Sequence, residues 1–269
     1  MKQKNILKKP TAVKESLFIK SFRLAKSNPN KTGYMILFDL LFLGSLYVLQ
    51  FLSQYFAQSL AIAQSLASAL VFIVYSLIYY LIALFFYSFF KYINLDFIKS
   101  LFENTEFSFK KLGQFYSLNI LIAGIFFAAM ILANLLLAST KVQYRPFVFI
   151  VLAVPYLLFL YAVINIAHSL FYEGSSIKES AKKSFKIAFT KMKIYRETVL
   201  IMILFALLLW LLFLGSGYVV RLLTSKNYSL YLNAYAYFKQ ISIVVVDAVS
   251  YLAILLNRIS FYGIIRNSD

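Results

Sequence analysis

Six long apolar segments alternate with short polar connections along this chain. Each segment holds about 20 residues with almost no charge, which is the length an α-helix needs to cross a hydrocarbon core of about 30 Å. The alternation does not resemble the ~10-residue strands of an outer-membrane barrel. The pattern predicts an all-α polytopic membrane protein with six transmembrane helices, over residues 33–52, 66–90, 116–137, 147–171, 199–220 and 241–265. An alternative start for the last helix is the aromatic stretch that begins at Tyr228.

A basic segment with helical periodicity precedes the first, third and fifth apolar segments. In the third of these, lysines separate apolar residues that recur at steps of three and four, namely Ile177, Ala181, Phe185, Ala188 and Met192. The second places on one face Ile98, Leu101, Phe102, Phe109 and Leu112. The first covers residues 14–27 and ends at a turn around Pro29. We therefore expect three transmembrane hairpins, each preceded by a cytoplasmic amphipathic helix.

The three basic segments share the triplet Ser-Phe-Lys/Arg, at residues 21–23, 108–110 and 184–186. Residues 14–16 and 21–25 also match residues 178–180 and 184–188. We interpret the match as an internal triplication within a single membrane domain (1–269), with units 1–92, 93–173 and 174–269. Chance matching in a chain rich in Phe, Lys and Ser is the alternative. The serine and phenylalanine of each triplet are expected to mark the border between the polar and apolar faces of the helix.

The charge distribution predicts an orientation in the membrane. The chain is 62% hydrophobic and carries a net charge of +17. Of its 27 basic residues, 21 lie within residues 2–31, 91–111 and 178–196 and at the C-terminus, five lie in the alternate connections, and Arg258 lies inside the last span. By the positive-inside rule, both termini are cytoplasmic in a protein of the cell membrane.

This charge also indicates a partner. Anionic lipid headgroups on the cytoplasmic side fit it better than nucleic acid, which we do not expect to bind. A protein partner or a homo-oligomer is the alternative. The cations expected to contact headgroups are Arg23, Lys110, Lys182, Lys183 and Lys186.

Several polar residues fall inside or beside the predicted spans. An ionisable group near the centre of a span costs about 2.5–3.5 kcal/mol on insertion scales, so each is a candidate functional residue. Asp247 and Arg258, eleven residues apart, share one helix face about 16 Å apart and cannot pair directly. Position near a span end is the simpler explanation for some of these residues, because long cations extend to the headgroups. The candidates are Asp39, Asn165, His168, Asp247, Asn257 and Arg258.

Recognisable reaction chemistry is missing from the sequence. The absence of cysteine excludes disulfides, thiolate nucleophiles and Cys-based metal sites. The single histidine, His168, cannot form a His-based metal site by itself. No HExxH, Walker A or GxSxG motif occurs. We expect no cofactor, no metal and no enzymatic activity.

The recurring unit, seen at residues 14–25 and 178–188, resembles prokaryotic six-span membrane proteins related to the membrane domain of glycerophosphodiester phosphodiesterases. The resemblance implies a helical membrane domain over most of the chain. The catalytic part of those phosphodiesterases is a separate soluble domain, and no segment here is long or polar enough to form one. No catalytic residue carries over.

Three functions are compatible with the sequence. We favour a non-enzymatic membrane protein whose basic helices contact anionic lipid or a partner protein. The alternative is a transporter or permease component that uses Asp39, Asp247 and Arg258. The third is a lipid-acting enzyme embedded in the membrane, with His168 or an aspartate as acid and base. Efficient acid-base chemistry needs a second positioned group, and none stands at a fixed spacing.

Overall fold

The computed structural model describes residues 16–60, 66–105, 107–190 and 192–266. Within these ranges the chain is helical and forms no strand, so the prediction of an all-α protein is confirmed. Six helices are long and apolar enough to cross a membrane. In chain order the elements are α1 (Leu17–Ser27), α2 (Pro29–Leu60), α3 (Leu66–Ser100), α4 (Phe109–Ser139), the short 3-10 helix η1 (Val142–Tyr144), α5 (Arg145–Tyr172), α6 (Ile177–Thr190), α7 (Met192–Thr224) and α8 (Tyr228–Arg266).

The long helices extend beyond the predicted spans, because helical hydrogen bonding continues into the polar flanks. α3 continues past Phe90 through a polar stretch to Ser100, and α8 begins at Tyr228, as the alternative start for the last helix allowed. The turn predicted around Pro29 is present, and α2 begins at that residue. Proline is tolerated there because the first turn of a helix has no partner for its backbone N–H.

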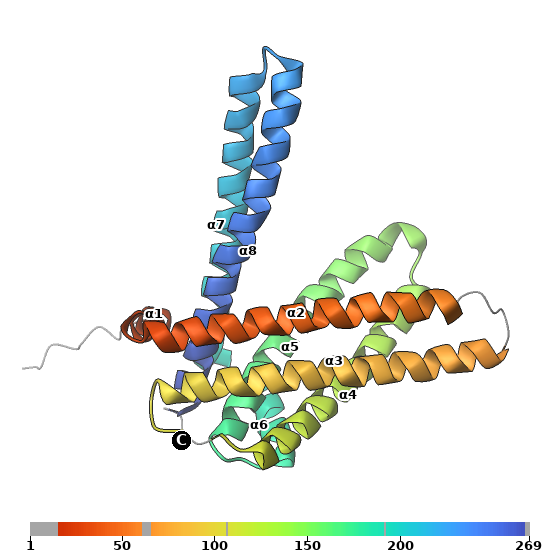
Figure 1. Cartoon of the computed structure of the whole chain (residues 1–269), viewed down its shortest axis with the longest axis vertical. Helices are drawn as coiled ribbons and strands as arrows, with labels where there is room; N and C mark the ends of the chain where they lie inside the picture. The colour runs from red at the N-terminus through yellow and green to blue at the C-terminus, as the bar shows by residue number, and fades with distance from the viewer. Residues whose placement is uncertain (1–15, 61–65, 106, 191, 267–269) are drawn as a thin grey trace, which may run out of the picture.

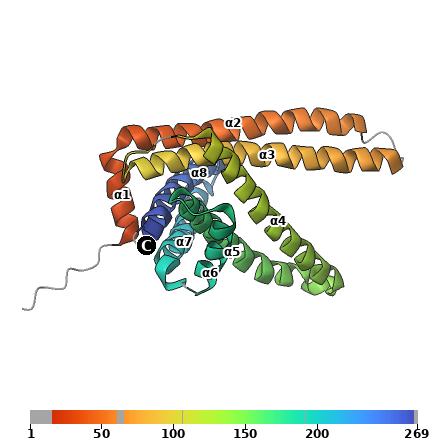
Figure 2. The same cartoon turned by 90° about the horizontal axis from the view of Figure 1, so that it is seen from below.

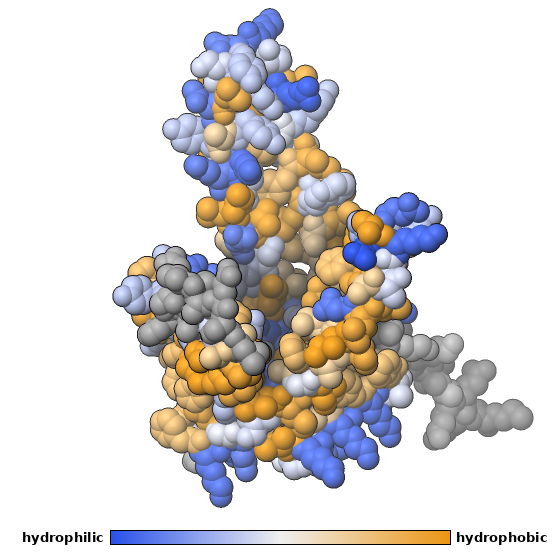
Figure 3. All heavy atoms as spheres, turned by 90° about the vertical axis from the view of Figure 1, so that its right-hand side faces the viewer, coloured by the Kyte–Doolittle hydropathy of each residue, from blue (hydrophilic) through white to orange (hydrophobic). Residues whose placement is uncertain are grey.

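Consecutive long helices pack on one another: α2 on α3, α3 on α4, α4 on α5, and α7 on α8. We refer to α2–α3, α4–α5 and α7–α8 as the three pairs. Aromatic side chains join the first pair, where Phe38 stacks on Phe97 with ring centroids 5.8 Å apart. The three pairs are close together at one end of the molecule and diverge towards the other (Figures 1 and 2). We call the shared end, where α1, α6, residues 101–105 and Arg266 lie, the basic end. Hydrophilic residues gather along the lower edge of the surface, and the surface is hollowed between the diverging pairs (Figure 3).

Only two of the three predicted amphipathic segments form separate helices, α1 and α6. Of the first segment, residues 14 and 15 lie outside the described ranges. The prediction for the second segment is wrong. Ile98 belongs to α3, the chain turns at Leu101 and Phe102, and Phe109 and Leu112 belong to α4. The apolar face of that segment is divided between the two long helices that it connects.

The buried face of α1 and α6 consists of small residues. Ser21 and Ala25 are buried in α1, and at the matching positions Ser184 and Ala188 are buried in α6. Small side chains let two helices approach closely, a common feature of membrane helix packing. α1 packs on α8, where Ser21 Oγ lies 2.8 Å from Ser260 Oγ, and α6 packs on α4 and α5.

The expected role of the triplets therefore needs correction. Their serines in α1 and α6 are not at a polar border but at the centre of a protein contact. The phenylalanines differ from each other: Phe22 is exposed, whereas Phe185 packs on Phe126 of α4 and Phe159 of α5. The contact orients the remaining face of each helix outward, and this face carries the cations.

An ion-pair network links the turn after α3 to the end of α8. The Glu103 carboxylate is 2.9 Å from Lys99 Nζ and 3.4 Å from Arg266 Nη2. The hydrogen bond from Lys99, with the charges of Lys99 and Arg266, lowers the pKa of Glu103 below its ordinary value of 4.5. A carboxyl with a lowered pKa stabilises the fold above its unfolded-state pKa, and this stabilisation is lost as the pH falls through the folded-state value.

At pH values under about 4.5, the thermal stability of the unchanged protein should decrease more than that of a Glu103→Gln variant. The reason is that only the unchanged protein loses this network when the carboxylate is protonated. The effect should be below about 1 kcal/mol, since these side chains are partly exposed. Melting temperatures of both proteins at pH 6 and pH 3.5 give the comparison. An equal decrease in both would show that Glu103 contributes no pH-dependent stability.

Candidate functional site

The second helix of each pair lies at the centre of the basic end. α3, α5 and α8 contact one another there. Each contributes one buried asparagine: Asn94 from α3, Asn165 from α5 and Asn257 from α8. A buried amide in an apolar environment must find hydrogen-bond partners, so these positions favour close association of the three helices. We call the polar residues buried around them the central polar cluster.

Asp39 of α2 is the most connected residue of the central polar cluster. Its Oδ2 atom accepts hydrogen bonds from Arg258 Nη1 and from the Tyr251 hydroxyl, both at 2.7 Å. Its Oδ1 atom accepts a bond of 2.7 Å from Asn94 Nδ2. The carboxylate thereby links α2 to α3 and α8. Charge-assisted hydrogen bonds of this length are stronger than neutral ones, and here they lie inside the predicted membrane region.

A second chain of hydrogen bonds runs from α5 through α4 to α3. His168 Nε2 lies 2.7 Å from Asn119 Oδ1, and Asn119 Nδ2 donates to Ser88 Oγ at 3.0 Å. Because Asn119 Oδ1 is an acceptor, we assign the proton of the His168 ring to Nε2. The other ring nitrogen, Nδ1, is buried and has no hydrogen-bond partner. The ring itself packs on Phe115, with centroids 4.6 Å apart, and on Tyr87 at 6.2 Å.

Lys91 of α3 is the third ionisable element of the central polar cluster. Its residue surface is only 6% exposed, which is unusual for lysine. It lies close enough to Asp39, Arg258 and His168 to interact with each of them electrostatically. No ion pair or hydrogen bond of Lys91 is found among the described residues. Two basic side chains thus lie near one carboxylate, which Arg258 already pairs.

The structure brings together five of the six predicted intramembrane residues. Asp39 and Arg258 form an ion pair, Asn257 donates to the Tyr161 hydroxyl at 3.0 Å, and Asn165 bonds the backbone of its own helix. Arg258 therefore does not extend to the headgroups. His168 is buried inside the protein.

Asp247 is the exception. It is exposed near the middle of α8, at an open cleft between α7 and α8 that also includes Trp210 and Lys239. The bonds from α8 to Asp39 come from Tyr251 and Arg258, further along the helix, and not from the part that carries Asp247. The five predicted headgroup cations are exposed on the basic end, namely Arg23, Lys110, Lys182, Lys183 and Lys186.

Sequence reasoning missed Lys91, Asn94 and Asn119. Lys91 ended the predicted second span and was counted with the cytoplasmic charges, although it is buried within α3. One signal for Asn94 was present: residues 93–94, 164–165 and 256–257 each read Ile-Asn or Leu-Asn, near the end of the second helix of a unit. Asn119 offered no signal, since a lone asparagine in a span has no recognisable partner.

The hydrogen bonds of the central polar cluster connect side chains from five helices, α2, α3, α4, α5 and α8. Among the described residues no three His, Cys, Asp or Glu side chains lie close enough to share a metal ion. The Asp39 carboxylate accepts bonds there from Arg258, Tyr251 and Asn94.

No family model, curated protein or solved structure matches this chain. The resemblance to the membrane domain of glycerophosphodiester phosphodiesterases therefore stays a prediction from the repeated segment.

Proposed function

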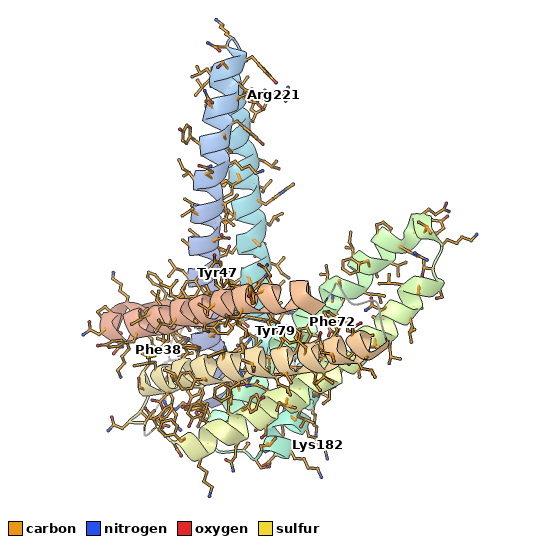
Figure 4. The ribbon with its side chains drawn as sticks, turned by 45° about the vertical axis from the view of Figure 1, so that its right-hand side comes forward. Phe38, Tyr47, Phe72, Tyr79, Lys182 and Arg221 are labelled. Carbon is orange, nitrogen blue, oxygen red and sulfur yellow. The ribbon has the colours of Figure 1, made fainter. Side chains whose placement is uncertain are left out.

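We propose that this multi-pass membrane protein is non-enzymatic and that its basic end binds the anionic headgroups of the cytoplasmic leaflet. The observation that supports the proposal is the docking of α6 through Ser184 and Ala188. Because this face is buried against α4 and α5, the lysines of the helix face outward. Lys182 lies at the lower end of the molecule, far from Arg221 at the tip of the α7–α8 pair (Figure 4).

The exposed lysines of α6 favour contact with anionic headgroups. Lys182 and Lys186 are exposed, and Lys183 forms an ion pair with Glu179 at 2.7 Å. Each basic residue beside an anionic surface contributes about 1 kcal/mol of attraction. α1 carries further exposed cations at the same end, with Lys20 and Arg23 among them. Helices held rigidly on the bundle bind headgroups without the cost of ordering a free segment.

The test compares the lipids that surround the full-length protein. Protein reconstituted in mixed phosphatidylcholine and phosphatidylglycerol vesicles is extracted in small polymer discs, and the lipids of each disc are quantified by mass spectrometry. We expect phosphatidylglycerol to be enriched at least about twofold over the vesicle composition. Simultaneous replacement of Lys182, Lys183 and Lys186 by Gln should reduce this enrichment.

The matched control removes the same charge from the opposite end of the molecule. It replaces three exposed cations in the outer part of the α7–α8 pair by Gln, namely Arg221, Lys226 and Lys239. This variant should keep the enrichment. Equal enrichment in the α6 variant and in the control would contradict the proposal.

A transporter or permease component is the second candidate, favoured by the ion pair between Asp39 and Arg258 inside the membrane region. Paired intramembrane charges mark ion or solute pathways in many transporters. Asp247 does not belong to this arrangement. Under this alternative, proteoliposomes would show an ion flux that disappears when Asp39 is replaced, and an unaltered flux would exclude it.

A further inference from the structure

An apolar groove of about 630 Å³ lies between α2, α3 and α4. Its walls include Phe42 from α2, Leu84 and Tyr87 from α3, and Gly124 and Phe127 from α4. This volume is within the ~300–1,000 Å³ typical of small-molecule sites in proteins. The groove is separate from the exposed cations of the basic end.

The groove leads to the central polar cluster. On α3 its floor follows Leu77, Leu81, Leu84 and Tyr87 at steps of three and four, and the next position of this face is Lys91. On α2 the residue three positions before Phe42 is Asp39, and on α4 the residue four positions before Ala123 is Asn119. Each apolar face of the groove therefore ends at a buried polar residue.

Tyr87 connects the two regions physically. Its ring lines the groove, packs edge-on against Phe42 with centroids 6.0 Å apart, and contacts the His168 ring. Tyr87 also lies within electrostatic range of Arg258 and Asp39. An occupant of the groove therefore meets ionisable residues of the central polar cluster at the end marked by Tyr87.

The charges at this end define the occupant. Asp39 forms its ion pair with Arg258 and also accepts bonds from Tyr251 and Asn94, so a single carboxylate stands against two basic side chains, Arg258 and Lys91. Lys91 is more than nine-tenths buried and has no partner among the described residues. A buried charge without a partner is costly, and one monovalent anion balances it. The side chains of the central polar cluster already pack together, so the anion beside Lys91 must be small, and a carboxylate meets this requirement.

We propose that the groove binds a single-chain fatty-acid anion. Its alkyl chain lies between α3 and α4, and its carboxylate lies against Lys91 beside Tyr87. The apolar walls provide the affinity for the chain, and Lys91 distinguishes the acid from an uncharged analogue.

The test measures equilibrium binding of tritiated palmitate, with hexadecanol as the uncharged analogue, to the full-length protein stripped of lipid in detergent. The unchanged protein should bind palmitate saturably. Lys91→Met should weaken palmitate binding at least about tenfold and leave hexadecanol binding unaltered, because a hydrogen bond to a charged group is lost. Saturable binding that Lys91→Met does not weaken would overturn the proposal, as would the absence of saturable binding.

A second variant tests the groove itself and does not depend on Lys91. A Cβ atom added at Gly124 meets no other atom within 4 Å, so this groove-lining position faces open space and we expect Gly124→Phe to fill the groove. It should weaken binding of both probes. The matched control is Gly215→Phe on α7, where the space is also open.

Two further outcomes are decisive. If the Lys91→Met protein does not fold, Lys91→Arg should bind palmitate and Gly124→Phe should still lose it. Equal binding by the Gly124→Phe and Gly215→Phe variants would overturn the proposal. The proposal would also be overturned if the stripped protein retained a two-chain phospholipid in place of palmitate and the Gly124→Phe variant released that phospholipid.

Discussion

Replacement of Asp39 by alanine is expected to destabilise the protein by roughly 3–5 kcal/mol, the range measured when one partner of a buried ion pair is removed. The substitution leaves the Arg258 guanidinium uncompensated and removes the acceptor of Tyr251 and Asn94. Denaturation of the full-length protein in mixed detergent micelles gives the free energy of unfolding.

Two further variants separate the charge effect from general sensitivity. Asp247→Ala removes an exposed carboxylate from the same set of predicted residues and should change the stability by less than about 0.5 kcal/mol. The double variant Asp39→Leu with Arg258→Leu removes both charges and should recover most of the loss, since apolar replacement of a complete buried pair is often neutral. A stability of Asp39→Ala close to that of Asp247→Ala would show that the ion pair does not hold α2 to α8.

Replacement of Ala188 by leucine is expected to destabilise the docking of α6 by about 1–3 kcal/mol, which is the usual cost of inserting methylenes into a packed interface. Ala188 is 1% exposed and faces the helices that α6 covers. The added side chain should move α6 away from the bundle. Trypsin should then cleave faster after Lys182 and Lys183, and the melting temperature should fall.

The control for this experiment introduces the same residue on the opposite face of the same helix. Lys186→Leu lies at an exposed position and should alter stability by no more than about 0.5 kcal/mol. It raises hydrophobicity, as Ala188→Leu does, and leaves helix propensity nearly unchanged. If both variants lost equal stability and were cleaved equally fast, α6 would not be docked through its small residues.

The number and order of the spanning helices could be predicted because each depends on local sequence. A run of about 20 apolar residues satisfies its backbone hydrogen bonds within itself, and no distant partner is needed. The prediction of a second amphipathic helix was wrong for a related reason. Its periodicity is real, but two long helices extend into it from both sides, and the turn at Leu101 and Phe102 divides it.

The central polar cluster was less predictable because it depends on contacts across the chain. Asp39 and Arg258 are 219 positions apart, and no local pattern indicates that they meet. Charge rules also placed Lys91 at the surface, since a lysine that follows an apolar run normally lies at the interface. The docking of α6 through small residues was also not predicted, because Ser184 is polar and a polar residue is expected at the border between the polar and apolar faces of the helix.

The three helix pairs converge at the basic end and diverge from it (Figure 1). The spanning helices contain 28–39 residues, more than an upright helix needs in a core of about 30 Å. They therefore match the bilayer by tilting, and a thinner bilayer requires more tilt. Because the pairs converge at the basic end, we expect their free tips to move apart as tilt increases. The membrane area that the protein occupies thus depends on bilayer thickness.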